Sequence, residues 1–232
     1  MKGLAAATGP DARLNASRVR LMLEAMKHRG GDGEAIIELD GVCLGATTKC
    51  TLPHERASAP AAQLPSGPMG LLDGRVDEAD RLLRECGARP AAGADDVDAA
   101  LAAIVASPQT FAERVLGEYA LVVWDPRTRE LQLSRDRFGI KSLYYARLGD
   151  GWLVASEVQA LVRAGVPADP DRQSVAAALV EEHHEYDRTL LAGVTPVACG
   201  GVVRLEGAAP FVLRCFSPER VPVDPRPDAE GR

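Results

Sequence analysis

The chain's five cysteines are the first candidates for nucleophiles or metal ligands. They are Cys43, Cys50, Cys86, Cys199 and Cys215. Their number is odd and no two form a C-x-x-C pair, which fits reduced thiols better than a disulfide framework or a zinc site. Free cysteine packs as a small hydrophobic residue. We therefore expect these thiols to be small core or surface residues.

A histidine pair, His183-His184, lies among glutamates and suggests a metal site at first sight. Adjacent residues on a helix point about 100° apart, so two neighbouring histidines rarely bind one ion. A solvated polar helix face is the better interpretation, and we predict no metal site in this chain.

The elements that must position any site are clearest in residues 117–156. Residues 119–124 form a short apolar run closed by a turn at 125–128, which is typical of a strand buried on both faces. Residues 131–134 alternate apolar and polar side chains and are expected to pair back as a hairpin. Residues 143–147 and 152–155 repeat this arrangement around a Gly-rich turn.

Before this stretch, residues 3–7 are expected to form a strand. Asn15 or Ser17 can cap a helix with Val19, Met22 and Met26 on one face. Residues 35–39 and 42–46 flank Asp40-Gly41, a dipeptide typical of a tight hairpin turn.

The remaining elements are assigned from the same signals. We predict a loop over 53–68, a short strand over 69–72 that ends in Asp73-Gly74, and a helix whose first residue is capped by Asp95 or Asp96. The other expected helices are 78–86, 111–116, 158–164 and 174–182, and a closing hairpin pairs 202–205 with 211–214. The Pro-rich tail, 217–232, is predicted to be disordered.

Composition limits the function classes. The chain has 232 residues, 46% of them hydrophobic, and a net charge of −6. This acidic balance argues against a nucleic-acid or membrane-surface partner. No signal peptide or segment of about 18 apolar residues is present, so a cytoplasmic protein is expected. Grouped strands and helices favour an α+β fold, and neither G-x-G-x-x-G nor a P-loop indicates nucleotide binding.

Three motifs in this order resemble the N-terminal glutaminase domain of the asparagine synthetase family, the class II glutamine amidotransferases. They are GEYALVVWD (117–125), RDRFGIKSLYY (135–145) and ASEVQAL (155–161), with HRGGD (28–32) upstream and residues 193–204 downstream. Ser142 and Gly31 stand where the family has proline. The resemblance assigns residues 1–216 to one domain and implies a four-layer α-β-β-α sandwich of the N-terminal-nucleophile hydrolase type.

The resemblance also implies a mechanism that this chain lacks. Active family members attack the glutamine amide with an N-terminal cysteine whose α-amine serves as the base. The matching position is Lys2, and a lysine ammonium with a pKa of about 10.4 is a nucleophile only when strongly desolvated. A bulky Lys2 should also retain Met1. The catalytic position is therefore expected to be inactive, with a desolvated Lys2 amine left as an alternative.

The positions that bind glutamine in the family also lack the expected groups in this chain. Thr48, followed by Lys49, replaces the arginine that grips the glutamine carboxylate, so the bidentate contact is lost. The oxyanion-hole motif N-G-E becomes Asp73-Gly74-Arg75, which puts a carboxylate where an amide donor is needed. Asp96 lies in the motif that holds the glutamine amine. It could still bind an amine, although capping of the following helix is the simpler role.

In RDRFGIKSLYY the charged cluster Arg135-Asp136-Arg137 could bind an anion. We predict a structural ion-pair role for it.

Three hypotheses follow. The main one is a pseudo-glutaminase that acts as scaffold for a separate ATP-dependent amide-forming synthetase, as in the degenerate first domains of β-lactam synthetases and lasso-peptide cyclases. The second is a residual glutamine-hydrolysing amidotransferase that supplies ammonia, and the third is an amino-acid-binding module that keeps the Asp96 contact. ATP and magnesium are implied only for a synthetase domain, whose S-G-G-x-D-S loop this chain lacks. A separate synthetase-domain protein is the expected partner, and a homodimer is left open.

Overall fold

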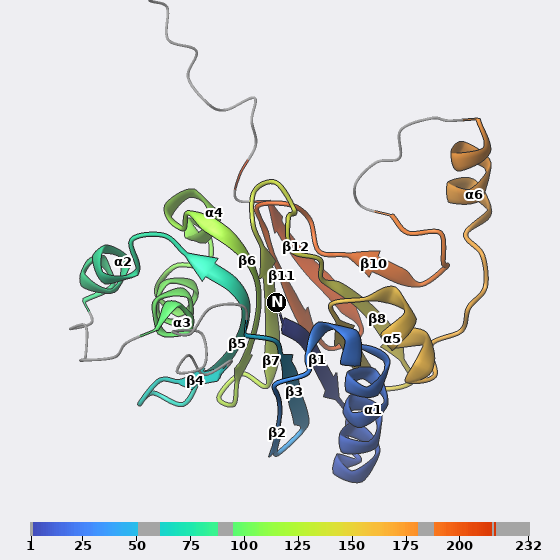
Figure 1. Ribbon diagram of the computed structural model, residues 1–232, viewed down its shortest axis with the longest axis horizontal. Coiled ribbons are helices and arrows are strands. Elements are labelled where there is room, and N and C mark those ends of the chain that lie inside the picture. Colours follow the sequence, from blue (N-terminus) through green and yellow to red (C-terminus); the bar gives the residue numbers. More distant parts are fainter. Residues whose placement is uncertain (1, 51–60, 88–94, 181–187, 215, 217–232) are drawn as a thin grey trace, which may run out of the picture.

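The computed structural model describes residues 2–50, 61–87, 95–180, 188–214 and 216. Within these residues the strands form two six-stranded antiparallel sheets, and helices cover the outer face of each (Figure 1). The layers follow one another as helix, sheet, sheet and helix. This confirms the predicted α+β class and the four-layer sandwich.

The first sheet has the order β10 (Val194–Pro196), β8 (Tyr144–Leu148), β9 (Gly151–Ala155), β1 (Lys2–Thr8), β3 (Val42–Thr48) and β2 (Gly33–Leu39). The second has the order β12 (Ala209–Arg214), β11 (Gly201–Glu206), β7 (Glu130–Arg135), β6 (Gly117–Asp125), β5 (Met69–Val76) and β4 (Ala61–Gln63). The described helices are α1 (Ala12–Ala25), η1 (Lys27–Arg29, a 3₁₀ turn), α2 (Ala79–Glu85), α3 (Asp96–Ala106), α4 (Phe111–Arg114), α5 (Val158–Arg163) and α6 (Arg172–Leu179).

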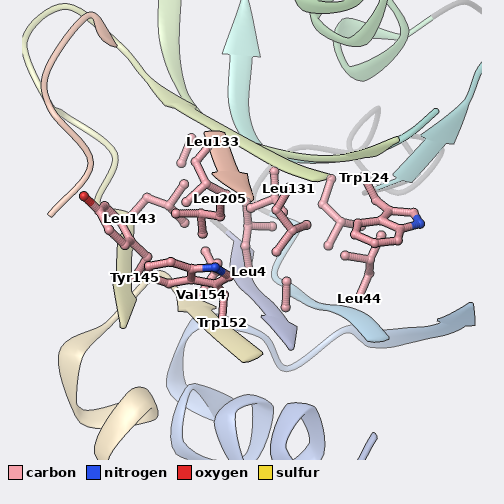
Figure 2. Packing of buried hydrophobic residues seen from close by; sticks show 14 of the residues in the cluster. Leu4, Leu44, Trp124, Leu131, Leu133, Leu143, Tyr145, Trp152, Val154 and Leu205 are labelled. Carbon is pink, nitrogen blue, oxygen red and sulfur yellow. The ribbon is translucent and has the colours of Figure 1, made fainter. Parts of the chain in front are cut away.

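Three apolar layers hold these elements together. In the central layer, side chains of the two sheets point toward one another, among them Leu4, Leu44, Trp124, Leu133 and Trp152 (Figure 2). A second layer lies between the β5 and β6 strands and helices α2 and α3. A third lies between the β1 and β9 strands and helices α1 and α5. Each sheet therefore buries both of its faces.

Strand β6 shows why its sequence is apolar without alternation. The inter-sheet layer takes Ala120, Val122 and Trp124, and the layer beneath the helices takes Tyr119, Leu121 and Val123. Because successive side chains of a strand point to opposite faces, every one of them needs an apolar neighbour. The prediction of a strand buried on both faces is confirmed.

The two predicted hairpins of residues 117–156 are also confirmed, but they belong to different sheets. Strands β6 and β7 pair in the second sheet, and β8 and β9 pair in the first. The chain crosses from one sheet to the other through residues 136–143. The hairpin at Asp40-Gly41 is confirmed as well, with Gly41 at a φ of +79°.

The first helix starts earlier than predicted. Asp11 is its N-cap and accepts a hydrogen bond from the Leu14 N–H at 3.0 Å. Asn15, one of the two caps predicted, is instead buried and donates to the Gly9 carbonyl at 3.0 Å. The predicted apolar face is correct, since Val19, Met22 and Met26 are all buried.

Two other boundaries differ from the sequence prediction. Strand β5 does not end at Asp73-Gly74 but continues in register with β6 to Val76. Residues 61–63, predicted as loop, form the short edge strand β4, which pairs with β5. The strand predicted over 69–72 is shorter than β5 because Asp and Gly are rare inside strands and were taken to end it. The His183-His184 pair and residues 217–232 lie outside the described residues.

None of the described helices combines the length and the apolar content needed to cross a bilayer.

A substitution at Leu133 tests the packing of the central layer. It lies on β7 between the sheets and is fully buried. Leu133→Ala is expected to lower the free energy of unfolding by about 2–5 kcal/mol, since it removes buried methyl groups and leaves a cavity. Leu21→Ala is the control, because Leu21 is 47% exposed on α1. It should change the free energy of unfolding by less than about 0.5 kcal/mol. Urea denaturation measures both, and equal effects would contradict this packing.

Candidate functional site

Three residues singled out from the sequence meet at the start of β1. Lys2 is the first residue of β1 and lies opposite Thr48 of β3 in the strand register. Asp73 reaches it from β5 of the other sheet, where its Oδ1 accepts a hydrogen bond from the Lys2 backbone N–H at 2.8 Å. The nucleophile position and the oxyanion-hole position of the family are therefore adjacent in this fold.

Asp73 is a buried carboxylate surrounded by positive groups. Its side chain is 1% exposed. Besides the Lys2 N–H, the Lys141 Nζ lies 3.6 Å from its Oδ1 and the Arg29 Nη1 lies 3.7 Å from its Oδ2. A buried charge is tolerated only when it is paired and hydrogen-bonded, so these groups are what stabilises a carboxylate here.

Arg29 connects this carboxylate to a second one. Its Nε donates to the Glu157 Oε1 at 2.5 Å, and both side chains are largely buried, at 16% and 17% exposure. Its Nη2 donates to the Ser142 Oγ at 3.2 Å and its Nη1 to the Lys2 carbonyl at 3.5 Å. We call Arg29, Asp73, Lys141 and Glu157 the ion-pair cluster.

Ser142, which stands where the family has proline, is part of the same network. Its Oγ donates to the Ser156 carbonyl at 2.7 Å while accepting from Arg29. The Ser156 Oγ in turn accepts from the Leu4 N–H at 3.0 Å. Proline could make neither contact of Ser142, because it has no side-chain hydroxyl. The substitution thus adds a hydrogen-bonded connection between the cluster and β1.

Asp96 does not cap its helix. Asp95 is the N-cap residue of α3, and its N–H donates to Asp98 Oδ2 at 2.9 Å. The Asp96 Oδ2 instead accepts from the Val76 N–H at 3.0 Å. The capping role predicted for Asp96 is therefore wrong, because its side chain points toward the end of β5.

The pKa of Asp96 reports its surroundings. Burial raises this pKa above its ordinary value, and the Asp95 and Asp77 charges act in the same direction. The Val76 hydrogen bond and the positive charge of Lys2 lower it in part. The Lys2 ammonium therefore acts electrostatically on the carboxylate that, by the family resemblance, would meet a substrate amine.

The remaining predicted site residues do not join the cluster. Arg75 pairs with Asp77 at 3.7 Å, with both side chains well exposed. Lys49 is exposed at the end of β3, and the carbonyl of Thr48 accepts from the Asp32 N–H at 3.0 Å. Gly74 has a φ of +117°, and a side chain there would collide with the Glu118 carbonyl. Glycine at residue 74 thus has a backbone reason that does not depend on catalysis.

The charged triplet Arg135-Asp136-Arg137 has the structural role predicted, with different partners. Arg135 donates to the carbonyls of Val197 and Gly139, and Arg137 to those of Ala112 and Glu113. Asp136 accepts from backbone N–H groups. Within the described part of the chain these side chains hold backbone groups and not one another, so the prediction of an ion pair is wrong.

Sequence reasoning missed four residues of the network. Arg29, Lys141, Ser142 and Glu157 all lie inside the motifs that carry the family resemblance. Among the charged side chains of these motifs, the sequence predicts a role only for the Arg135-Asp136-Arg137 triplet. The available signal was that each motif places a charged or hydroxyl side chain next to a turn, where it can reach a neighbouring element.

The arrangement differs from the one that the family resemblance implies for amide hydrolysis. With Met1 in place, the Lys2 nitrogen is a peptide N–H that donates to Asp73, so it cannot serve as the general base. An anionic Asp73 would repel a developing oxyanion. The thiol of Cys43 offers no substitute nucleophile, because burial raises its pKa to about 11 and keeps it protonated.

A substitution at Arg29 tests how much the ion-pair cluster stabilises the fold. Arg29→Ala leaves Asp73 and Glu157 without their shared cation, and it is expected to lower the free energy of unfolding by about 3–5 kcal/mol. Arg20→Ala is the matched control, since Arg20 forms an exposed ion pair with Glu38. This substitution should lower the free energy of unfolding by less than about 1 kcal/mol. Similar losses in the two variants, measured by urea denaturation, would refute the importance of the cluster.

The lowered pKa of Glu157 predicts that the free energy of unfolding falls at acid pH. Burial by itself raises its pKa, but hydrogen bonds with Arg29, Gln159 and His28 outweigh burial and hold the pKa below its ordinary value. Such a carboxylate stabilises the fold above its unfolded pKa of about 4.3. That contribution is lost as the pH falls through the lower folded pKa.

Glu157→Gln should therefore flatten the dependence of unfolding free energy on pH between about pH 5 and pH 3. The measurement is a series of urea titrations across that range. An unchanged slope in the variant would show that Glu157 is not responsible.

Comparison with curated proteins identifies long relatives that share this region. A putative glutamine-hydrolyzing asparagine synthetase of Mycobacterium bovis is 33% identical over 112 residues, which cover 46% of this chain and 17% of that protein. The glutamine-hydrolyzing asparagine synthetase 1 of Bacillus subtilis is 24% identical over 197 residues, which cover 83% of this chain and 31% of that protein. The chain thus spans less than a third of the length of these relatives.

The solved structures agree with the architecture. The glutamine phosphoribosylpyrophosphate amidotransferase of B. subtilis, complexed with ADP and GMP, has a TM-score of 0.66 at 14% identity, and the match covers 92% of this chain and 49% of that one. At this identity the likeness shows the fold alone, that of the N-terminal-nucleophile hydrolases. The sequence family described as glutamine amidotransferase domain matches residues 1–211. The chain therefore belongs to the glutamine amidotransferase domain family, in the form found in asparagine synthetases.

Proposed function

We propose that this domain has lost glutaminase activity and serves as a scaffold for an ATP-dependent, amide-forming synthetase. The observation that carries the proposal is the buried Asp73 carboxylate, which accepts the Lys2 N–H and lies beside the Arg29 and Lys141 cations. A carboxylate accepts hydrogen bonds and has no N–H to donate to a developing oxyanion. The amide donor on which acyl transfer depends is therefore missing from this position.

A neighbouring observation supports the same proposal. Thr48, at the position of the family's carboxylate-gripping arginine, offers no bidentate cation. The contact that would recognise the glutamine carboxylate is thus changed, while Asp96 could still meet the amine.

The alternative is a residual glutamine-hydrolysing activity that supplies ammonia for asparagine-type amide synthesis. The names of the two asparagine synthetases described above favour it, as both include glutamine hydrolysis. In this chain it would require a desolvated Lys2 amine as nucleophile, since Lys2 occupies the position of the family's cysteine. ATP and magnesium belong, in either case, to the synthetase partner.

Glutamate release from glutamine separates these functions. The wild-type chain is expected to release none above an enzyme-free blank. Lys2→Cys, prepared with Met1 removed, should also remain inactive because Asp73 and Thr48 are unchanged. Turnover is expected only when this change is combined with Asp73→Asn and Thr48→Arg.

Two results would contradict the proposal. Wild-type turnover that Lys2→Ala abolishes would establish the residual hydrolase. Turnover in the Lys2→Cys variant alone would show that Asp73 and Thr48 do not disable the pocket.

A further inference from the structure

Three carboxylates lie side by side on neighbouring strands of the second sheet. The strand register places Asp125 of β6 opposite Glu130 of β7. It also places Leu131 of β7 opposite Leu205 of β11, so Glu206, the next residue of β11, lies beside Glu130. Like charges that face one another across strands destabilise a sheet. This row of carboxylates therefore needs compensating groups.

The carboxylates point to the outer face of the sheet, away from the first sheet. Leu131 and Leu205 lie in the central layer (Figure 2). Because successive side chains of a strand point to opposite faces, Glu130 and Glu206 point the other way. Glu206 is exposed, but Glu130 is only 8% exposed. A carboxyl group as buried as Glu130 is ionised at a cost unless a cation compensates it.

The two arginines of the β6–β7 turn bind other carboxylates. The Arg127 guanidinium donates to the Asp125 Oδ1 and Oδ2 at 3.2 and 2.9 Å and lowers the pKa of that carboxyl group. The Arg129 Nη1 lies 2.6 Å from the Asp40 Oδ2. The charge of Asp125 is therefore compensated within its own turn.

The groups that face Glu130 leave it uncompensated. Burial raises the pKa of Glu130, and Glu206 raises it further through a side-chain hydrogen bond and its charge. The Arg204 charge and a hydrogen bond with Thr128 lower this pKa only in part. The Arg204 guanidinium also lies over the Phe211 ring, 4.7 Å from its centroid. A hydrogen bond between two carboxyl groups requires a proton on one of them, since a carboxylate has no donor.

Glu206 is followed by a residue that connects the two sheets. The Gly207 carbonyl accepts hydrogen bonds from the Trp152 Nε1 at 3.2 Å and from the Arg147 Nη1. Both donors belong to the β8–β9 hairpin of the first sheet. A displacement of Glu206 would therefore also disturb a contact between the sheets.

We propose that Glu130 and Glu206 share one proton and form a pH-sensitive latch at the end of β11. While the proton is present, the Glu130 carboxyl group donates to the Glu206 carboxylate and holds β11 against β7. When the proton is lost to solvent, two carboxylates face one another, and the turn at Gly207 loosens from the first sheet.

The shared proton makes the folded state more stable at lower pH. The folded pKa of Glu130 lies above its unfolded value of about 4.3, so the folded chain binds more protons than the unfolded chain between these two values. The stabilisation is fully present below about pH 4.3 and is lost as the pH rises through the folded pKa. This trend is opposite in sign to that of Glu157.

Glu130→Gln tests the latch, because glutamine cannot ionise and keeps an amide that can donate to Glu206. Relative to this variant, the folding equilibrium constant of the full wild-type chain should fall at least about threefold between pH 5 and pH 8. Urea denaturation across this range measures it. Asp96, whose pKa is also raised, is present in both chains and cancels in the comparison.

Glu38→Gln is the matched control. Glu38 is an exposed strand residue that pairs with Arg20. The ratio of its folding equilibrium constant to that of the wild type should stay constant over the same range.

The indole N–H of Trp152 gives a local measurement, since it donates to the Gly207 carbonyl. The chain has two tryptophans, and Trp152→Phe identifies which of the two indole signals in a proton–nitrogen NMR spectrum belongs to Trp152. This signal should shift with pH in the wild type and stay constant in Glu130→Gln. In Glu206→Gln the midpoint of the shift should move to lower pH, because the like charge is gone.

The outcomes separate the parts of the proposal. Parallel pH profiles of the wild type and Glu130→Gln would show that no proton is shared and would overturn it. Diverging profiles with a constant Trp152 signal would show that the proton does not control the turn, which would overturn the latch. Diverging profiles with a Trp152 shift whose midpoint Glu206→Gln lowers would support both the shared proton and the latch.

Discussion

A carboxylate enclosed between two sheets must be compensated by donors and cations, and around Asp73 this requirement connects segments that are distant in sequence. The Lys2 N–H comes from β1, the Arg29 guanidinium from η1 and the Lys141 ammonium from the loop between β7 and β8. Arg29 then extends the network to Glu157 at the start of α5. Removal of Arg29 or Lys141 takes a cation away from a buried carboxylate, so the stabilising effects of these groups depend on one another.

The fold does not depend on the chemistry of the pocket. Its three apolar layers lie between and outside the sheets, and strand β6 contributes alternate residues to two of them. The residues at the family's catalytic positions lie at the start of β1, outside those layers. Residues such as Lys2 and Asp73 can therefore differ from the family pattern while the sandwich keeps its packing, which is why family membership and activity are separate questions.

One loop links the altered pocket to the outer surface. Asp136 fixes its backbone, Lys141 faces Asp73, and Phe138 faces solvent. The backbone of this loop is thus held by one buried carboxylate, while its side chains reach the ion-pair cluster on one side and solvent on the other.

The sequence by itself determined most of the strands, the hairpins and the family, because apolar runs, turn dipeptides and long motifs are local signals. The edge strand β4 and the last residues of β5 were not predicted. It also indicated that residues 2, 48 and 73 lack the family's reactive groups. Only the tertiary structure decided that Asp73 is paired with Arg29 and Lys141, that Asp96 binds the Val76 N–H and not the start of its own helix, and that Phe138 is exposed. These facts depend on contacts between residues far apart in the chain. Sequence spacing does not encode the burial that makes such contacts necessary.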